Sequence, residues 1–163
     1  MSVLIIFIQK AIVQGICILY GALGEIMTEK SGNLNLGIPG IMYMGGISGL
    51  MGAFFYEKDN PNPNALVGVL ISLLCAFVVA SLGGLIYSVL TITLRVNQNV
   101  TGLALTIFGT GFGNFVGGSI SKRAGGVGQI SVKVTGSAYT AKIPGLSEIP
   151  VIGDLFFSYG FMT

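Results

Sequence analysis

The chain alternates long apolar segments with short polar stretches, and this pattern predicts helices that cross a membrane. Three stretches lack any Asp, Glu, Lys or Arg, and they run from Lys30 to Glu57, from Asp59 to Arg95 and from Arg95 to Lys122. Each is longer than the ~20 residues that an α-helix needs to cross the hydrocarbon core of a bilayer. We therefore predict an all-α, polytopic membrane helix bundle with four spanning segments. These segments cover about residues 3–23, 38–55, 65–94 and 103–118.

The polar stretches between these segments predict where the helices break. Residues 57–64 include two Pro and three Asn, which is typical of a solvated turn. Helix breaks are expected near 25–40 and 95–102, and Pro39 in the first of them suits the first turn of a helix. A helix that begins inside the membrane exposes free N–H groups and the positive end of its dipole. Transporters build binding sites from interrupted helices of this kind, and ordinary interfacial loops are the alternative interpretation of both breaks.

The last third of the chain is predicted to leave the membrane and to return to it. Residues 119–149 form a polar extramembrane loop, and alternating Ile/Val and polar residues around 129–134 predict a short hairpin or an extended strand. The start of a fifth apolar segment lies near Ile149, and the sequence ends at Thr163 before that segment crosses. Because unpaired backbone groups are costly in lipid, we expect residues 1–163 to be a single transmembrane domain of a longer protein.

The composition agrees with a membrane protein and excludes several kinds of site. Only 9% of the residues are charged and 26 of 163 are Gly, whereas soluble domains hold about 25% charged residues. The sequence contains no His, so it cannot supply a His-based metal site or a catalytic triad. The net charge of +2 gives no basis for a nucleic-acid partner. We predict no metal site in this chain, no cofactor of its own and no enzymatic activity.

Small residues at four-residue spacing predict helix–helix contacts. In lipid, Gly and Ala at positions i and i+4 let two helix backbones approach closely. This spacing occurs in the second, third and fourth predicted helices. The expected packing glycines are Gly45, Gly49, Gly84, Gly109, Gly113 and Gly117.

The two helix breaks hold the candidate groups for binding a solute. Amide side chains both donate and accept hydrogen bonds, and a charged group within a membrane segment often marks a solute path. Lys10 shares a helix face with Gln14, and it either lines such a path or extends to the interface. The candidate pathway residues are Asn33, Asn35, Gly37, Pro39, Gly40, Asn97, Gln98 and Asn99. The candidate structural or gating charges are Lys10, Glu25, Glu29 and Arg95.

Two motifs in the chain resemble a known family. GALGEIMTEKSGNLNLGIPGIMYMGGISGLMGA at 21–53 and LRVNQNVTGLAL at 94–105 are similar to the N-terminal half of the permease subunit of bacterial ABC importers. The similar branch is shared by ribose-type sugar, branched-chain amino-acid and nucleoside permeases. Within it, the chain most resembles nucleoside or simple-sugar permeases that work with a BMP-family lipoprotein. Relatives usually carry Glu where this chain has Pro39, so no role of that carboxylate is transferred.

The resemblance implies a function, a location and a set of partners. It implies a permease subunit that forms part of the translocation path for a nucleoside or simple sugar, as a multi-pass protein of the bacterial inner membrane. The implied partners are a second permease subunit, ATP-binding subunits that hold ATP-Mg, an extracytoplasmic binding lipoprotein, membrane lipid and the small-molecule solute. By the resemblance, residues 119–149 face outward, although the positive-inside rule alone favours the cytoplasm. A small homo-oligomeric pore or scaffold, complete at this length, is the alternative.

Overall fold

The computed structural model describes residues 3–123, 130 and 132–140, and within these residues it contains helices and no strands. Four helical segments are long and apolar enough to cross a membrane. This confirms the predicted all-α class and the four spanning segments, whereas the expected fifth segment lies outside the described residues. The elements are α1 (Val3–Lys30), α2 (Ile38–Asp59), α3 (Ala65–Ser88), the π-helix η1 (Val89–Thr93), α4 (Gln98–Arg123) and α5 (Lys133–Tyr139).

The first helix break is shorter than predicted, because α1 continues to Lys30. Glu and Lys are good helix formers, so the polar end of this segment extends the helix. The N–H of Gly32 donates to the Glu29 carbonyl at 2.9 Å, and the N–H of Asn33 donates to the Thr28 carbonyl at 3.0 Å. Together with the positive φ of Gly32, +84°, these bonds form a Schellman motif that ends α1. The first break therefore covers residues 31–37.

The second break is also shorter than predicted, and it covers residues 94–97. The side-chain oxygen of Asn97 accepts hydrogen bonds from the N–H groups of Asn99 and Val100, at 3.0 and 3.2 Å. An Asn that accepts these bonds is a favourable N-cap, and α4 accordingly begins at Gln98 rather than near Leu103. Gln98 and Asn99 consequently lie in the first turn of a helix and not in a loop.

The predicted hairpin or strand around 129–134 is wrong at Lys133 and Val134, which begin α5. The carboxylate of Glu57, in the last turn of α2, accepts hydrogen bonds from the N–H groups of Lys133 at 2.9 Å and Thr135 at 2.6 Å. These bonds satisfy free donors of the first turn and favour a helix there. Residues 119–123, predicted as the start of a loop, belong to α4, which continues to Arg123.

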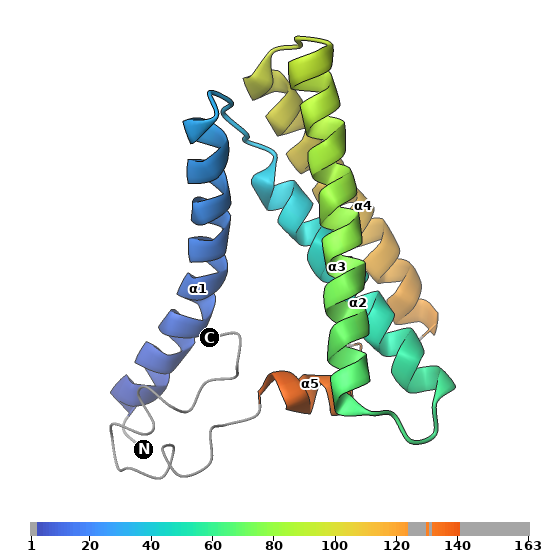
Figure 1. Cartoon of the computed structure of the whole chain (residues 1–163). Helices are drawn as coiled ribbons and strands as arrows, with labels where there is room; N and C mark the ends of the chain where they lie inside the picture. Colours follow the sequence, from blue (N-terminus) through green and yellow to red (C-terminus); the bar gives the residue numbers. More distant parts are fainter. Residues whose placement is uncertain (1–2, 124–129, 131, 141–163) are drawn as a thin grey trace.

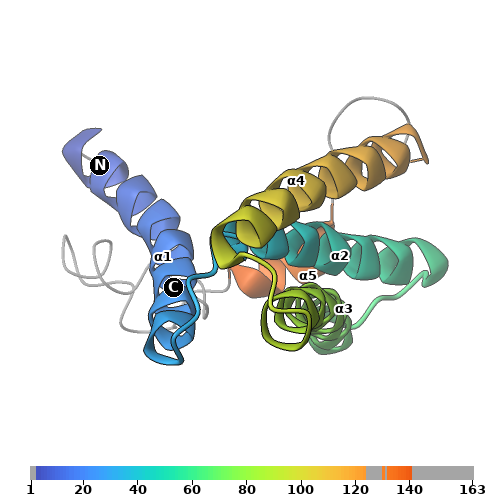
Figure 2. The ribbon, with the colours of Figure 1, turned by 90° about the horizontal axis from the view of Figure 1, so that it is seen from above.

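Helices α2, α3 and α4 pack together, while α1 stands apart from them over most of its length (Figures 1 and 2). Met44 of α2, Tyr87 of α3 and Leu105 of α4 form the buried core. A Cβ at Gly49 would lie 3.0 Å from the Ser72 carbonyl oxygen, and one at Gly45 would lie 3.3 Å from the Ala76 carbonyl oxygen. Glycines of α2 thus lie directly against the backbone of α3.

The predicted packing glycines of the other helices differ in what they meet. A Cβ at Gly109 would lie 2.5 Å from the carbonyl oxygen of Gly40, so these two backbones cross in contact. Gly113 faces the ring of Tyr43, and a Cβ at Gly117 would lie 3.5 Å from Ile47. By contrast, no atom of the described residues lies within 4 Å of a Cβ placed at Gly84. The neighbouring Gly83 faces α2 instead, where a Cβ would lie 3.1 Å from Ile41.

Candidate functional site

The two helix breaks meet at one end of the bundle (Figure 1). The side chain of Gln98, in the first turn of α4, connects them. Its Oε1 accepts a hydrogen bond from the N–H of Leu34 at 2.9 Å, and its Nε2 donates to Oδ1 of Asn33 at 3.0 Å. Two candidate residues that are 65 positions apart in the sequence are therefore in direct contact.

Side chains from three helices hold the remaining backbone of the first break. The hydroxyl of Tyr87 in α3 donates to the Leu34 carbonyl at 2.6 Å, and the hydroxyl of Thr106 in α4 donates to the Leu36 carbonyl at 2.7 Å. On the other side, Oε1 of Glu25 in α1 accepts from the N–H of Asn35 at 3.0 Å. Buried loop backbone must find such partners, because no helix supplies them. Tyr87 and Thr106 were not among the predicted residues, because they lie in apolar segments with no local signal.

The start of α2 is fixed by Asn35, whose side chain is buried, with 5% of its surface exposed. Its Oδ1 accepts a hydrogen bond from the N–H of Gly37 at 2.9 Å, which forms a tight turn just before the helix. Gly37 and Gly40 then pass close to α4, and a Cβ at Gly40 would lie 2.6 Å from the carbonyl oxygen of Leu105. As Figure 1 shows, α2 begins deeper in the bundle than the ends of α1 and α3.

The other candidates take different positions. Asn97 caps α4 through its side chain, and the Asn99 side chain is exposed on the first turn of α4. Arg95 is an exposed residue with a φ of 52°, where the backbone turns between η1 and α4. Lys10 is exposed on α1, and it does not line the cavity described next.

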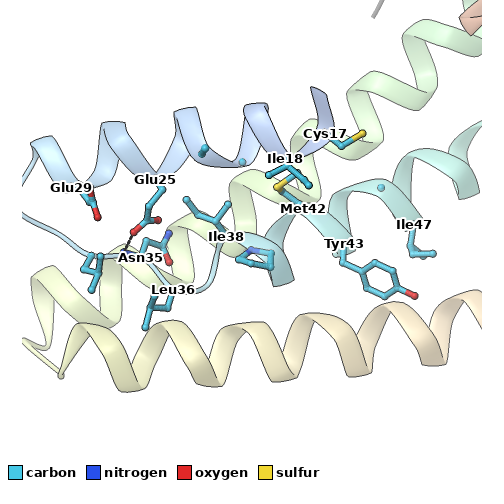
Figure 3. Close-up of a pocket in the computed structure, with 15 residues that line it drawn as sticks. Cys17, Ile18, Glu25, Glu29, Asn35, Leu36, Ile38, Met42, Tyr43 and Ile47 are labelled. Carbon is cyan, nitrogen blue, oxygen red and sulfur yellow. Dashed lines mark hydrogen bonds between the residues drawn. The ribbon is translucent and has the colours of Figure 1, made fainter. Parts of the chain in front are cut away.

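A cavity of about 910 Å³ lies between α1 and the beginning of α2 (Figure 3). Its walls are mainly apolar, with Ile18 of α1 and Ile38 and Met42 of α2 pointing into it. The remaining polar side chains are few, and they include the carboxylates of Glu25 and Glu29 at one end. The lining residues are Cys17, Ile18, Gly21, Ala22, Glu25, Glu29, Leu34, Asn35, Leu36, Ile38, Pro39, Met42, Tyr43, Gly46 and Ile47.

At Gly21 and Gly24, the two glycines of α1 that face α2, the backbone of α1 meets side-chain atoms of α2. A Cβ at Gly21 would lie 2.9 Å from the sulfur of Met42, and one at Gly24 would lie 3.6 Å from Cδ1 of Ile38. Away from these contacts the two helices diverge (Figures 1 and 2). Glu25, Asn35 and Pro39 were predicted to lie near a solute path. The apolar wall was not predicted, because Ile and Met in a spanning helix carry no signal of their own.

The two carboxylates of the cavity differ in their bonding. Glu25 is engaged by the Asn35 N–H, and the Thr28 hydroxyl lies 3.5 Å from its other oxygen. The carboxylate of Glu29, one turn further along α1, has no hydrogen-bond partner within the described residues and points into the cavity (Figure 3). No group of three or more His, Cys, Asp or Glu that could hold a metal ion occurs in the described part of the chain.

The chain is similar to known transport proteins. Residues 7–156 match a family described as the permease component of the branched-chain amino acid transport system. The guanosine ABC transporter permease protein NupQ of Bacillus subtilis is 30% identical over 162 residues, which are 99% of this chain and 48% of that protein. The nucleoside ABC transporter permease protein NupC of Lactococcus lactis is 26% identical over 157 residues, which are 94% of this chain and 45% of that protein.

This chain thus spans about half the length of these curated relatives. No significant match to a solved structure was found. The family match covers most of the chain, including both helix breaks and the cavity between α1 and α2. This multi-pass membrane chain belongs to the family of permease components of the branched-chain amino acid transport system.

Proposed function

We propose that this chain forms part of the translocation path of an ABC importer for a nucleoside or a simple sugar. The cavity between α1 and α2 is the observation that carries the proposal. Its volume of about 910 Å³ lies in the range of small-molecule sites, and its apolar walls with a few polar groups are typical of them. The names of these two similar permeases, for guanosine and for nucleosides, agree with a nucleoside as the solute, and a third similar permease is named for glucose.

The proposed transport mechanism is alternating access. A binding lipoprotein delivers the solute from outside, ATP-binding subunits bind ATP-Mg, and a second permease subunit completes the path in the bacterial inner membrane. The chain itself forms and breaks no covalent bond. It supplies a cavity with two walls, α1 on one side and the start of α2 with the first break on the other, and these walls are held by different numbers of hydrogen bonds. Such a cavity changes its access when one wall moves against the other, and the partners set which state is populated.

The bonding of the first break supports α1 as the wall that moves. Gln98, Tyr87 and Thr106 tie the loop to α3 and α4, whereas Glu25 is the α1 side chain that hydrogen-bonds to it. The α2–α4 unit and the loop then form the fixed wall. In this proposal Asn35 and Pro39 line the path directly, and Asn33, Asn97 and Gln98 shape it by holding the backbone.

A pair of glycine substitutions tests whether the cavity is the path. Gly46 lines the cavity, and no atom of the described residues lies within 4 Å of a Cβ placed there. Gly46→Leu therefore adds a side chain to the open space without a clash. In cells that express the whole transporter, we expect it to lower the uptake of labelled guanosine or glucose to about a tenth, because the side chain occupies the solute's space.

Gly84→Leu is the matched control for this experiment. Gly84 is also a helical glycine, and a Cβ placed there meets nothing within 4 Å in the described part of the chain, but Gly84 lies on α3 and does not line the cavity. Wild-type uptake in Gly46→Leu, at normal protein levels, would overturn the assignment of the path. The alternative of a homo-oligomeric pore predicts uptake that does not depend on ATP, and the family assignment favours the importer.

A further inference from the structure

The cavity between α1 and α2 carries negative charge and no opposing positive charge. Its lining includes the carboxylates of Glu25 and Glu29, and no Lys or Arg is among the lining residues of the described chain. The nearest basic residues along α1 are Lys30, exposed at the end of the helix, and Lys10, seven residues before Cys17. Neither lines the cavity, so neither neutralises it from within.

Three features determine how strongly these two carboxylates act on a solute in the cavity. Apolar side chains of Ile and Met lie beside the half-buried Glu25, where a lower dielectric constant strengthens electrostatic interactions compared with water, whereas Glu29 is exposed. The hydrogen bond from Asn35 holds the Glu25 carboxylate in place, so its position is fixed. The Glu29 carboxylate is not used by any described residue, and it keeps its full capacity to accept hydrogen bonds.

We propose that Glu29, together with Glu25, makes the cavity a charge filter that admits uncharged or cationic solutes with N–H or O–H donors and excludes anions. The Glu29 carboxylate accepts hydrogen bonds from the N–H or O–H groups of the solute, and Glu25 contributes negative electrostatic potential from a fixed position. A nucleoside or a sugar meets this requirement through its hydroxyl and ring N–H groups, whereas its phosphorylated form is repelled. The inference rests on the proposed function for the identity of the solute, but the charge of the cavity is measurable without any transport.

Thiol-reactive probes of opposite charge measure this field directly. Ala22 lines the cavity on α1, one turn before Glu25 and two turns before Glu29. In a chain carrying Cys17→Ser and Cys75→Ser, the Ala22→Cys variant places a single thiol in the cavity. The purified protein in lipid nanodiscs is treated with cationic trimethylammonioethyl methanethiosulfonate or anionic sulfonatoethyl methanethiosulfonate. The ratio of the two rate constants reports the local potential, because the thiolate fraction cancels.

We expect the cationic reagent to be favoured over the anionic one more strongly than with free mercaptoethanol. Glu29→Gln and Glu25→Gln keep the size of the side chain and an oxygen acceptor but remove the charge. Each is expected to lower the cation-to-anion rate ratio about fivefold, and the double variant lowers it further, as expected for unit charges about 5 and 10 Å along α1 from the probe. Asp59→Asn, which removes a charge at the far end of α2, leaves the ratio unchanged.

Each contrary result overturns the charge filter. The inference is wrong if the ratio in the parent variant equals that of mercaptoethanol, or if the double Gln variant leaves it unchanged. It is equally wrong if Asp59→Asn lowers the ratio as much, because the effect then comes from net charge, or if neither reagent reaches the thiol. The proposed function fails separately, when Gly46→Leu retains uptake while the reagent rates still show a negative cavity.

Discussion

The crossing of α2 with α4 and the contact of α2 with α1 are built in opposite ways. At the α2–α4 crossing, a Cβ at Gly40 would lie 2.6 Å from the Leu105 carbonyl oxygen, and one at Gly109 would lie 2.5 Å from the Gly40 carbonyl oxygen. At the α1–α2 contact, a Cβ at Gly21 would meet side-chain atoms, at 2.9 Å from the sulfur of Met42 and 3.9 Å from Cγ2 of Ile38. The first contact joins two backbones, and the second joins a backbone to a side-chain tip.

Because of this difference, the side of α2 that faces α4 is fixed and the side that faces α1 is open. Backbone contacts cannot adjust, so they fix the distance and the register of the two helices. A long, unbranched Met side chain adapts to different distances and fills irregular space. The same helix, α2, therefore has one rigid side toward α4 and one adjustable side toward α1, and the cavity lies on the adjustable side (Figure 3).

The largest expected effect comes from breaking the rigid contact with Gly109→Leu. The new side chain would meet the backbone of Gly40, which cannot move without shifting α2. We expect the free energy of unfolding to fall by at least about 3 kcal/mol, at the upper end of the cost of overpacking. Unfolding in mixed dodecyl maltoside and sodium dodecyl sulfate micelles, followed by far-UV circular dichroism, measures this loss.

Gly111→Leu is the control for that change, because it makes the same substitution two residues away on α4. No atom of the described residues lies within 4 Å of a Cβ at Gly111. Since Leu has a higher helix propensity than Gly by roughly 0.8 kcal/mol, the control is expected to be neutral or slightly stabilising. Equal destabilisation by both substitutions would contradict the backbone contact between α2 and α4.

A smaller effect is expected from cutting the tie between the first break and α4 with Gln98→Leu. The N–H of Leu34 loses its acceptor, and Asn33 loses its donor. Leaving such groups without a partner costs about 2 kcal/mol, so the free energy of unfolding falls by that amount. The control is Asn99→Leu at the next residue, which removes an exposed amide side chain that does not hydrogen-bond to the first break. Its unfolding curve is expected to match that of the wild type. Similar curves for both variants would rule out Gln98 as the tie.

Much of the fold could be predicted from the sequence, because charge gaps and apolar length act locally. The gap between Lys30 and Glu57 is enough to predict that α2 spans the membrane. The boundaries were less predictable, because caps decide them: the Schellman turn at Gly32 extends α1, and the Asn97 cap starts α4 early. The hairpin or extended strand predicted around 129–134 is wrong at Lys133 and Val134 because the carboxylate of Glu57, 76 residues away from Lys133, favours a helix.

The candidate site shows the same division between local and distant information. The sequence drew attention to Asn35 and Gln98 because amides in an apolar chain are conspicuous. It could not show that the Gln98 side chain bonds to Leu34, since that partner lies 64 residues away, whereas the Asn35 side chain bonds to Gly37, only two residues along the chain. Nor could it find Tyr87, whose hydroxyl reaches a carbonyl 53 residues away. Side-chain type predicts hydrogen-bonding capacity, but only the packing of the helices determines which groups use it.

The smallest effect is expected from weakening the adjustable side with Glu25→Ala. This change removes the acceptor for the N–H of Asn35, and with it the side-chain hydrogen bond from α1 to the loop. Because Gln98, Tyr87 and Thr106 still hold the loop, we expect a cost of about 1 kcal/mol and about fivefold faster hydrogen exchange at the Asn35 amide. Exchange measured by mass spectrometry in nanodiscs tests this.

Two further variants separate the hydrogen bond from the charge in this experiment. Glu29→Ala removes the other carboxylate of the cavity, which accepts no hydrogen bond within the described chain. Hydrogen exchange at the Asn35 amide is therefore expected to stay at the wild-type rate. Glu25→Gln keeps an acceptor oxygen and is expected to restore slow exchange. If Glu29→Ala speeds exchange as much as Glu25→Ala, the two carboxylates act through charge alone. In that case the electrostatic field of the two carboxylates, and not a specific hydrogen bond, would hold the first break against α1. Helix α1 could then shift without breaking a bond to the first break.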